Sequence, residues 1–187
     1  MSVFCVSEKS GNRPADIQCR LEPMPGGYRL SGAKSWATLG PAGNFLLVAA
    51  RLPPHDAARP QLRMVRVRAE APGVTITLMP PTAFVPEVPH ARLTFEEVVI
   101  ADDEVLPGDG YERYIKPFRT VEDIHVTAAL LACALAEACR RDWPTAWRER
   151  AAMSLLGFEA LSQLDPAAPL TQLALTGALA GSSALFE

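Results

Sequence analysis

The first part of the chain alternates hydrophobic and polar residues in short runs, which prolines and glycines separate. The stretches RMVRVR and VTITL have the two-residue period that is typical of half-buried strands. This pattern predicts strands at 3–7, 16–22, 27–33, 34–38, 45–51, 62–68, 74–79 and 91–99. Seven or eight short strands with regular turn signals favour an antiparallel β-barrel or sandwich, and parallel βαβ units are not indicated.

The pattern becomes helical after Gly108–Gly110. The segment 121–141 contains no glycine or proline, and its apolar residues recur three and four positions apart, which predicts the core stripe of a helix. The stripe consists of Val121, Ile124, Ala128, Leu131, Leu135 and Ala138. A second helix is expected from Pro144 to about Leu164, and a third from Leu170. We therefore predict an α+β chain with a β-domain at 1–107 and two or three helices at 108–187.

The first predicted helix is more apolar than a three-helix arrangement requires. Residues 126–136 are apolar on nearly every side of the helix, so the two following helices cannot cover them all. Large exposed apolar patches usually mark an interface between proteins. The sequence therefore predicts that the chain forms an oligomer.

Composition and charge narrow the possible functions. Of the 187 residues, 49% are hydrophobic and 21% are charged, which is typical of a globular protein, and the net charge of −3 gives no basic footprint for nucleic acid. The apolar stretch 170–186 is interrupted by polar residues and glycines, so no membrane span is expected. The amino-terminal stretch does not have the pattern of a signal peptide, and we expect a cytoplasmic protein.

The cysteines and histidines do not have the spacing of a metal site. Cys5, Cys19, Cys133 and Cys139 form no CxxC pair, and His55, His90 and His125 are scattered along the chain. Neither a zinc site nor a disulfide framework is expected. We predict buried or half-buried thiols in a reducing compartment.

The stretch GYRLSGAKSWATLG at 27–40 places a bulky Trp36 among small and polar residues. Two interpretations are open. The indole could fill the interior of the β-domain, with Thr38 on the surface, or it could present its flat face to a ligand that is also flat.

Five segments, taken in order, favour the second interpretation over the first. They are FCVSEKSGN (4–12), YRLSGAKSWATLG (28–40), FLLVAA (45–50), APGVTI (71–76) and RLTFEEVVIADDEVLPGDG (92–110). Together they resemble the acyl-CoA dehydrogenase family, and specifically its middle β-domain joined to the start of its carboxy-terminal helical domain. The first two segments resemble the two flavin motifs of that family.

This resemblance implies that the β-domain binds FAD. It implies that Trp36 packs near the isoalloxazine ring, that the Thr38 hydroxyl bonds its reactive edge, and that Val6 and Ser7 contact its pyrimidine side. The full set of cofactor-binding residues that the resemblance implies is Phe4, Val6, Ser7, Trp36, Ala37 and Thr38. It also implies a substrate contact at Asn12.

The reaction that the resemblance implies is α,β-desaturation of an acyl-CoA thioester or a similar thioester. A carboxylate removes the α-proton while a hydride leaves the β-carbon for the flavin. A minority of the family places this carboxylate on the first long helix, where Glu122 stands in this chain. The alternative is that Glu122 is a solvated first-turn residue that the helix dipole favours. The resemblance also implies a homo-oligomer, or a hetero-oligomer with a related chain.

Several positions depart from the family pattern. Lys9 replaces a proline of the first motif, and Asp123 replaces an arginine beside Glu122. The amino-terminal helical domain and the last helices of the family have no counterpart here. Three interpretations therefore stay open: an enzyme that a second polypeptide completes, a degenerate non-catalytic flavin-binding or structural partner of a complete paralogue, and a related acyl-CoA oxidase or flavin monooxygenase.

Overall fold

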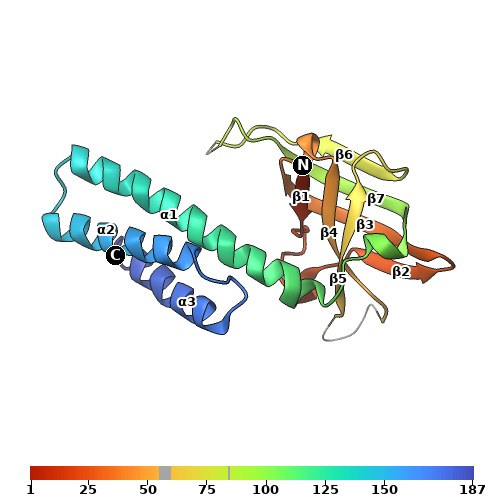
Figure 1. Ribbon diagram of the computed structural model, residues 1–187. Coiled ribbons are helices and arrows are strands. Elements are labelled where there is room, and N and C mark those ends of the chain that lie inside the picture. Colours follow the sequence, from red (N-terminus) through yellow and green to blue (C-terminus); the bar gives the residue numbers. More distant parts are fainter. Residues whose placement is uncertain (55–59, 84) are drawn as a thin grey trace. The chain divides into compact units, whose positions relative to one another are not determined.

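The computed structural model describes residues 1–54, 60–83 and 85–187. The chain forms two compact units, Met1–Tyr114 and Ile115–Glu187. The first unit is built from strands, coloured red to green in Figure 1, and the second from helices, coloured green to blue. The predicted α+β organisation, with three helices after the strands, is confirmed.

The first unit contains a curled mixed sheet of seven strands among the described residues (Figure 1). These are β1 (Ser2–Cys5), β2 (Arg20–Met24), β3 (Gly27–Thr38), β4 (Phe45–Arg51), β5 (Leu62–Arg68), β6 (Val74–Leu78) and β7 (His90–Ile100). Their order is β1-β4-β2-β3-β7-β6, and β5 also pairs with β4. Most pairs are antiparallel, as expected, but β1 runs parallel to β4 and β2 meets β4 through one parallel pair. Hydrophobic periodicity cannot distinguish these directions, because both have the same two-residue period.

The two strands predicted at 27–33 and 34–38 form the single long strand β3. Its pairing with β7 shifts register twice, between Leu30 and Gly32 and between Lys34 and Ala37. Such bulges bend a strand and re-aim its side chains. The second shift lies at Trp36, which therefore departs from the regular alternation of the strand.

Another boundary prediction was wrong by several residues. The strand expected at 16–22 begins only at Arg20, because Pro14–Asp16 forms a short 3-10 helix. The Asp16 carboxylate accepts a hydrogen bond from the backbone N–H of Arg13 (3.1 Å), and this local bond favours a turn over a strand. Further 3-10 helices follow at Gly40–Ala42 and Asp102–Glu104.

The core of the first unit collects the inward-facing residues of the sheet. Its members include Val3, Leu21, Leu30, Leu46, Val48, Val65, Val67, Leu93 and Phe95. Burying a side chain of this size contributes about 1.5–3 kcal/mol. Cys5 and Cys19 lie in the same core, where burial raises the pKa of each thiol to about 12. Both thiols are therefore protonated, and neither is accessible to a reagent in solution.

The second unit consists of three helices, which follow a π-helical turn at Tyr111–Ile115. They are α1 (Lys116–Arg140), α2 (Thr145–Ser162) and α3 (Pro169–Ser183). The first helix begins five residues earlier than predicted, with a proline in its first turn, a position that tolerates proline because the first N–H groups have no partner within the helix. Pro144 precedes α2, as expected.

The helices pack around Ile124, Leu131, Phe158 and Leu175, among others. The Trp147 indole N–H donates to the carbonyl oxygen of Leu185 (2.7 Å), which ties the end of the chain to α2. Many apolar side chains nevertheless stay exposed within this unit: Val126, Leu130, Met153, Leu156, Leu170 and Leu173.

Two expectations about this part of the chain have clear outcomes. Cys133 and Cys139 are exposed, so the expectation of buried thiols is wrong for these two and correct for Cys5 and Cys19. Among the described residues, no helix has the length and hydrophobicity needed to cross a membrane.

Candidate functional site

An open groove lies on the first unit beside Trp36. Its volume is ≈ 1010 Å³. It is lined by Glu8, Lys9, Ser10, Gln18, Ala33, Lys34, Ser35, Trp36, Met79, Arg92, Leu93 and Thr94. The Trp36 indole is half-buried, and the two exposed cations Lys9 and Arg92 belong to the lining. The groove therefore offers an aromatic face together with positive charge, a combination that suits a flat anionic ligand.

A buried ion pair lies among the lining residues of this groove. The Lys34 ammonium contacts a carboxylate oxygen of Glu8 at 2.6 Å, and their side chains are 0% and 5% exposed. The backbone N–H groups of Gln18 (2.6 Å) and Cys19 (3.1 Å) also donate to the Glu8 carboxylate. Lys34 donates in addition to the Val6 carbonyl oxygen (3.2 Å). Both charges are thus paired and hydrogen-bonded, the condition under which buried charges are tolerated.

The sequence contains a signal for this pair, although the two flavin motifs assign neither Glu8 nor Lys34 a role. The regular alternation of β3 places Lys34 opposite Leu93 of β7, a core position. A lysine at a core position requires a buried acceptor, and the SEK stretch (7–9) supplies one.

The segment 6–11 is fastened to β3 by further hydrogen bonds. The backbone N–H of Ser35 donates to the Ser7 carbonyl oxygen (2.9 Å), and the Ser35 hydroxyl approaches the same oxygen at 3.4 Å. Glu8 and Gly11 exchange backbone hydrogen bonds that close a tight turn. The structure therefore brings Ser7 next to Ser35, the residue before Trp36. Of the predicted cofactor contacts, Trp36 is among the residues that line the groove, whereas Phe4, Val6, Ser7, Ala37 and Thr38 are not.

The remaining predicted residues of the first motif lie close by in the chain. Phe4 and Val6 are both half-buried and share one side of the chain, opposite the core residue Cys5. Asn12, the predicted substrate contact, is exposed in the turn after Ser10.

The end of β3 holds the other predicted residues. Ala37 is fully buried opposite Ala91, so neither its side chain nor its backbone has a surface exposed to a ligand. Thr38 is exposed and pairs with His90 of β7. His90 lies outside the flavin motifs. The centroid of its ring lies 4.6 Å from that of the Trp36 ring, and the two ring planes make an angle of 36°.

Leu39, the next residue, has a left-handed backbone with φ of 60°. This conformation costs a residue with a branched side chain roughly 1–2 kcal/mol. Backbone strain of this kind clusters at functional sites.

Glu122 lies in α1, in the second unit. Its side chain keeps an exposed surface, but loss of solvation raises the pKa of its carboxyl, and Asp123 raises it further while Arg119 lowers it. Because α1 begins at Lys116, Glu122 stands in the second turn and not in the first. The helix-dipole explanation for its presence is therefore weak, since that effect fades beyond the first turn.

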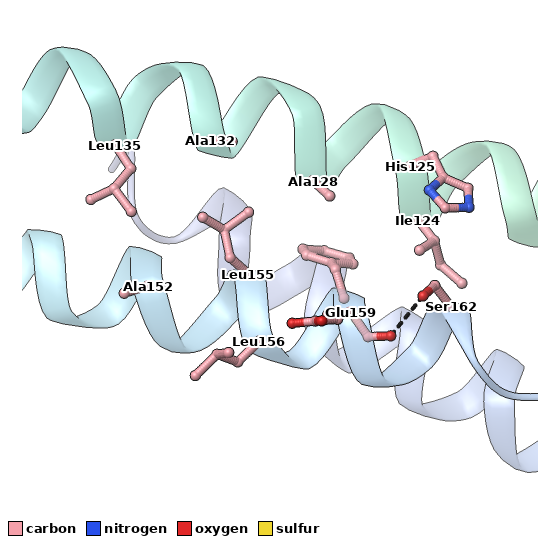
Figure 2. Close-up of a pocket in the computed structure, with 11 residues that line it drawn as sticks. Ile124, His125, Ala128, Ala132, Leu135, Ala152, Leu155, Leu156, Glu159 and Ser162 are labelled. Atoms are coloured by element: carbon pink, nitrogen blue, oxygen red, sulfur yellow. Dashed lines mark hydrogen bonds between the residues drawn. The ribbon is translucent and has the colours of Figure 1, made fainter.

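A second pocket lies between α1 and α2, with a volume of ≈ 600 Å³. Figure 2 shows its lining: mainly Leu135, Leu155, Leu156 and small alanines, with His125 near one end. The polar residue Ser162 uses its hydroxyl to bond the Glu159 carbonyl oxygen (2.7 Å), so it does not face a ligand freely. This pocket is mainly apolar, and its polar lining residues are His125, Glu159 and Ser162. The described residues also contain no cluster of three metal-ligating side chains, and His55 lies outside them.

Comparison with known proteins places these features in context. No family model matches the chain. The "Probable acyl-CoA dehydrogenase FadE10" of Mycobacterium tuberculosis is 33% identical to this chain over a match that covers 41% of this chain and 12% of that protein. The benzylmalonyl-CoA dehydrogenase of Aromatoleum aromaticum is 25% identical, over 74% of this chain and 36% of that protein. The mitochondrial 2-methylacyl-CoA dehydrogenase of Solanum tuberosum is 26% identical, over 57% of this chain and 26% of that protein. The matched part of this chain thus spans about a third or less of these relatives.

Solved structures share the fold over nearly the whole chain. A glutaryl-coenzyme A dehydrogenase in complex with glutaryl-CoA has a TM-score of 0.70 at 14% identity, covering 98% of this chain and 54% of its own. The butyryl-CoA dehydrogenase of Megasphaera elsdenii has a TM-score of 0.69 at 17% identity, and the match covers 99% of this chain and 54% of that one. A Mycobacterium smegmatis glutaryl-CoA dehydrogenase in complex with FADH2 has a TM-score of 0.68 at 15% identity, and the match covers 99% of this chain and 53% of that one. The chain spans about half the length of these proteins.

The buried ion pair allows a first prediction. Lys34→Met leaves the Glu8 carboxylate buried with only backbone donors, and we expect the free energy of unfolding to fall by about 3–5 kcal/mol. The double variant Glu8→Gln/Lys34→Met removes both charges and should recover part of that loss. Urea denaturation followed by circular dichroism measures both effects.

The exposed ion pair of Arg29 and Glu97 (3.3 Å, side chains 41% and 71% exposed) provides the control. Arg29→Ala should change the free energy of unfolding by less than about 1 kcal/mol. A Lys34→Met variant as stable as Arg29→Ala would show that the buried pair does not hold the groove together.

Proposed function

We propose, from the premise that this chain resembles the acyl-CoA dehydrogenases in sequence and shares their fold, that it binds FAD in the groove beside Trp36 and takes part in oxidising an acyl-CoA thioester. The observation that carries the proposal is the position of Trp36. Its ring is half-buried at an open groove of ≈ 1010 Å³, and the Ser7 segment of the first motif is bonded to its strand. A volume of this order suits a drug-sized ligand or cofactor.

The residues present fit a flavin. The Trp36 indole supplies an apolar face for a flat ring system, and the exposed Thr38 hydroxyl can donate or accept a hydrogen bond. Lys9 and Arg92 in the groove lining supply the positive charge that a pyrophosphate requires. Val6 and Ser7 already use their carbonyl oxygens to bind β3, so we assign ligand contacts to the Ser7 side chain and to their remaining backbone groups.

In the proposed reaction, the thioester loses two hydrogens and gains a double bond between its α- and β-carbons. A carboxylate takes the α-proton, and the electrons of that C–H bond form the new double bond. When bound, FAD would supply the acceptor for the hydride that leaves the β-carbon. The chain's own contribution is to bind and orient the flavin, through Trp36 and Thr38, and to provide the base.

Glu122 is the base that we propose. A general base works best when its pKa lies near the operating pH, and the raised pKa of Glu122 moves it in that direction. Asp123, in the place of the family arginine, contributes to this shift through its negative charge.

We propose further that the working protein is an assembly of more than one chain. The exposed leucines of α1 and α3 offer an apolar surface for such an assembly.

Flavin binding is the direct test of the proposed function. FAD should bind to the purified protein, and Trp36→Ala should weaken binding by about 1–3 kcal/mol because a buried aromatic contact is lost. Trp36→Phe keeps an aromatic ring and should lose less. Titration followed by flavin and tryptophan fluorescence measures the dissociation constants.

Trp143→Phe in the helical unit is the matched control and should bind FAD as the wild type does. If neither the wild type alone nor a mixture with a partner chain binds FAD, the proposed function is wrong. Binding without any reaction with acyl-CoA would instead assign the chain a non-catalytic role.

The assignment of Glu122 has its own test. Acyl-CoA added without oxygen should bleach the flavin absorbance of the FAD-loaded protein, and Glu122→Gln should slow bleaching at least 100-fold, because general bases contribute about 10²–10⁴-fold. The wild-type rate should rise with pH through the pKa of Glu122, since the base acts in its ionised form.

Asp123→Asn is the control, because it keeps Glu122 and removes the neighbouring charge. Its rate should stay high, and the rising part of its pH profile should move to lower pH, since Asp123 raises the pKa of Glu122. If Glu122→Gln bleaches as fast as the wild type, another carboxylate is the base.

Assembly is tested by sedimentation. We expect species larger than the 20.2 kDa monomer, and Leu130→Glu, which places a charge on an exposed leucine of α1, should shift the distribution toward the monomer. Val99→Glu in the first unit, a similarly exposed position, should not. A wild type that sediments only as a 20.2 kDa monomer contradicts this part of the proposal.

A further inference from the structure

His90 at the start of β7 is buried without hydrogen-bond partners. The residue is 4% exposed, and within the described part of the chain neither Nδ1 nor Nε2 has a hydrogen-bond partner. Its ring instead lies against Trp36, 4.6 Å away between centroids and tilted by 36°. The side chain thus contributes packing to the fold, while its polar atoms stay unused.

Packing alone does not explain a histidine at this position. A neutral imidazole carries one N–H donor and one acceptor nitrogen, and burying such groups without partners destabilises a protein. A phenylalanine would fill similar space and stack on Trp36 without that penalty. Buried polar atoms without partners are rare in folded proteins, and where they occur they call for an explanation.

The backbone holds His90 in a defined place beside the predicted flavin contacts. Its Cα pairs directly with that of Thr38, so both side chains lie on the same face of the sheet. The N–H of Met79 donates to the His90 carbonyl oxygen (2.8 Å), and the N–H of Leu39 donates to the carbonyl oxygen of Pro89 (2.8 Å). These bonds secure the start of β7 against both neighbouring segments.

We propose that His90 is a flavin-binding residue: an imidazole nitrogen forms a hydrogen bond with the isoalloxazine ring of a flavin held against Trp36 and Thr38. The inference rests on the proposed function and extends it to a residue outside the motifs. The ligand supplies the missing partner, because a flavin ring presents carbonyl oxygens, ring nitrogens and an N–H along its edge. The His90–Trp36 stack holds both rings in place before the ligand arrives.

The proposal predicts a separation between stability and binding. His90→Phe keeps the stacking ring and removes both nitrogens, so the ligand-free protein should be at least as stable as the wild type in thermal unfolding. Its affinity for FAD should nevertheless fall about tenfold, the effect of losing one hydrogen bond in a buried site. A residue with only a structural role would not separate these two measurements.

Three further measurements sharpen the test. Riboflavin carries the isoalloxazine ring without the adenine nucleotide, so its affinity should fall by the same factor as that of FAD. His90→Asn places an amide near the position of Nδ1, and His90→Gln places one near the position of Nε2. The variant that keeps its affinity for FAD and riboflavin identifies the nitrogen that forms the hydrogen bond. His125→Phe, the same substitution at an exposed site on α1, should leave both affinities unchanged.

Each outcome decides the proposal. His90→Phe that binds FAD and riboflavin as tightly as the wild type overturns it and leaves the proposed function intact. A loss for FAD alone also overturns it, because the contact would then involve the nucleotide part. If His90→Phe does not fold, the affinities of His90→Asn and His90→Gln for flavin decide. An equal loss of affinity in both variants overturns the proposal, because it means that the ring of His90, and not one of its nitrogens, is needed. A wild type that binds neither flavin overturns this proposal and the proposed function together.

Discussion

The contact between Glu8 and Lys34 joins two segments that the rest of the groove depends on. Both charges are removed from water, and each is satisfied by the other and by backbone groups of its surroundings. A buried ion pair is weak evidence for stability, because the desolvation of two charges offsets most of their attraction. The ion pair is effective at excluding other pairings of the Glu8 segment with β3, because any register that separates the two residues leaves a charge buried alone. In this chain the favoured register is the one that places Ser7 next to Ser35 and therefore beside Trp36.

The consequence of a register error here would be large. Successive side chains of a strand point to opposite faces, so a slip by one residue would exchange the core and groove faces of β3. The bulge at Trp36 adds a second constraint, since it changes the alternation at the one position where an aromatic ring borders the groove. The ion pair and the bulge together determine which side chains the sheet offers to a ligand.

Features that reduce stability gather at the same end of this sheet. Leu39 adopts a left-handed backbone directly after Thr38, and His90 buries two nitrogens without partners opposite Thr38. Each feature alone costs stability, and their proximity to Trp36 is what links them to binding. The helical unit differs: its unfavourable feature is exposed apolar surface, which another protein chain can cover and a small ligand cannot.

The sequence alone was sufficient for the element order, because a two-residue period and a helical period are local properties. It predicted β4 and β5 at their observed bounds, the breaks at Pro144 and before α3, and, through motif resemblance, the family whose fold the chain shares. It did not predict the parallel pairing of β1 with β4, the burial of Lys34 against Glu8, or the contact of His90 with Trp36. These depend on which distant segments meet in space, and the same local pattern is compatible with several pairings. The alternation of β3 marks Lys34 as a core position, but only the tertiary structure could decide that Glu8 would be its buried partner, and that an unassigned histidine would lie against the tryptophan that the motif had marked.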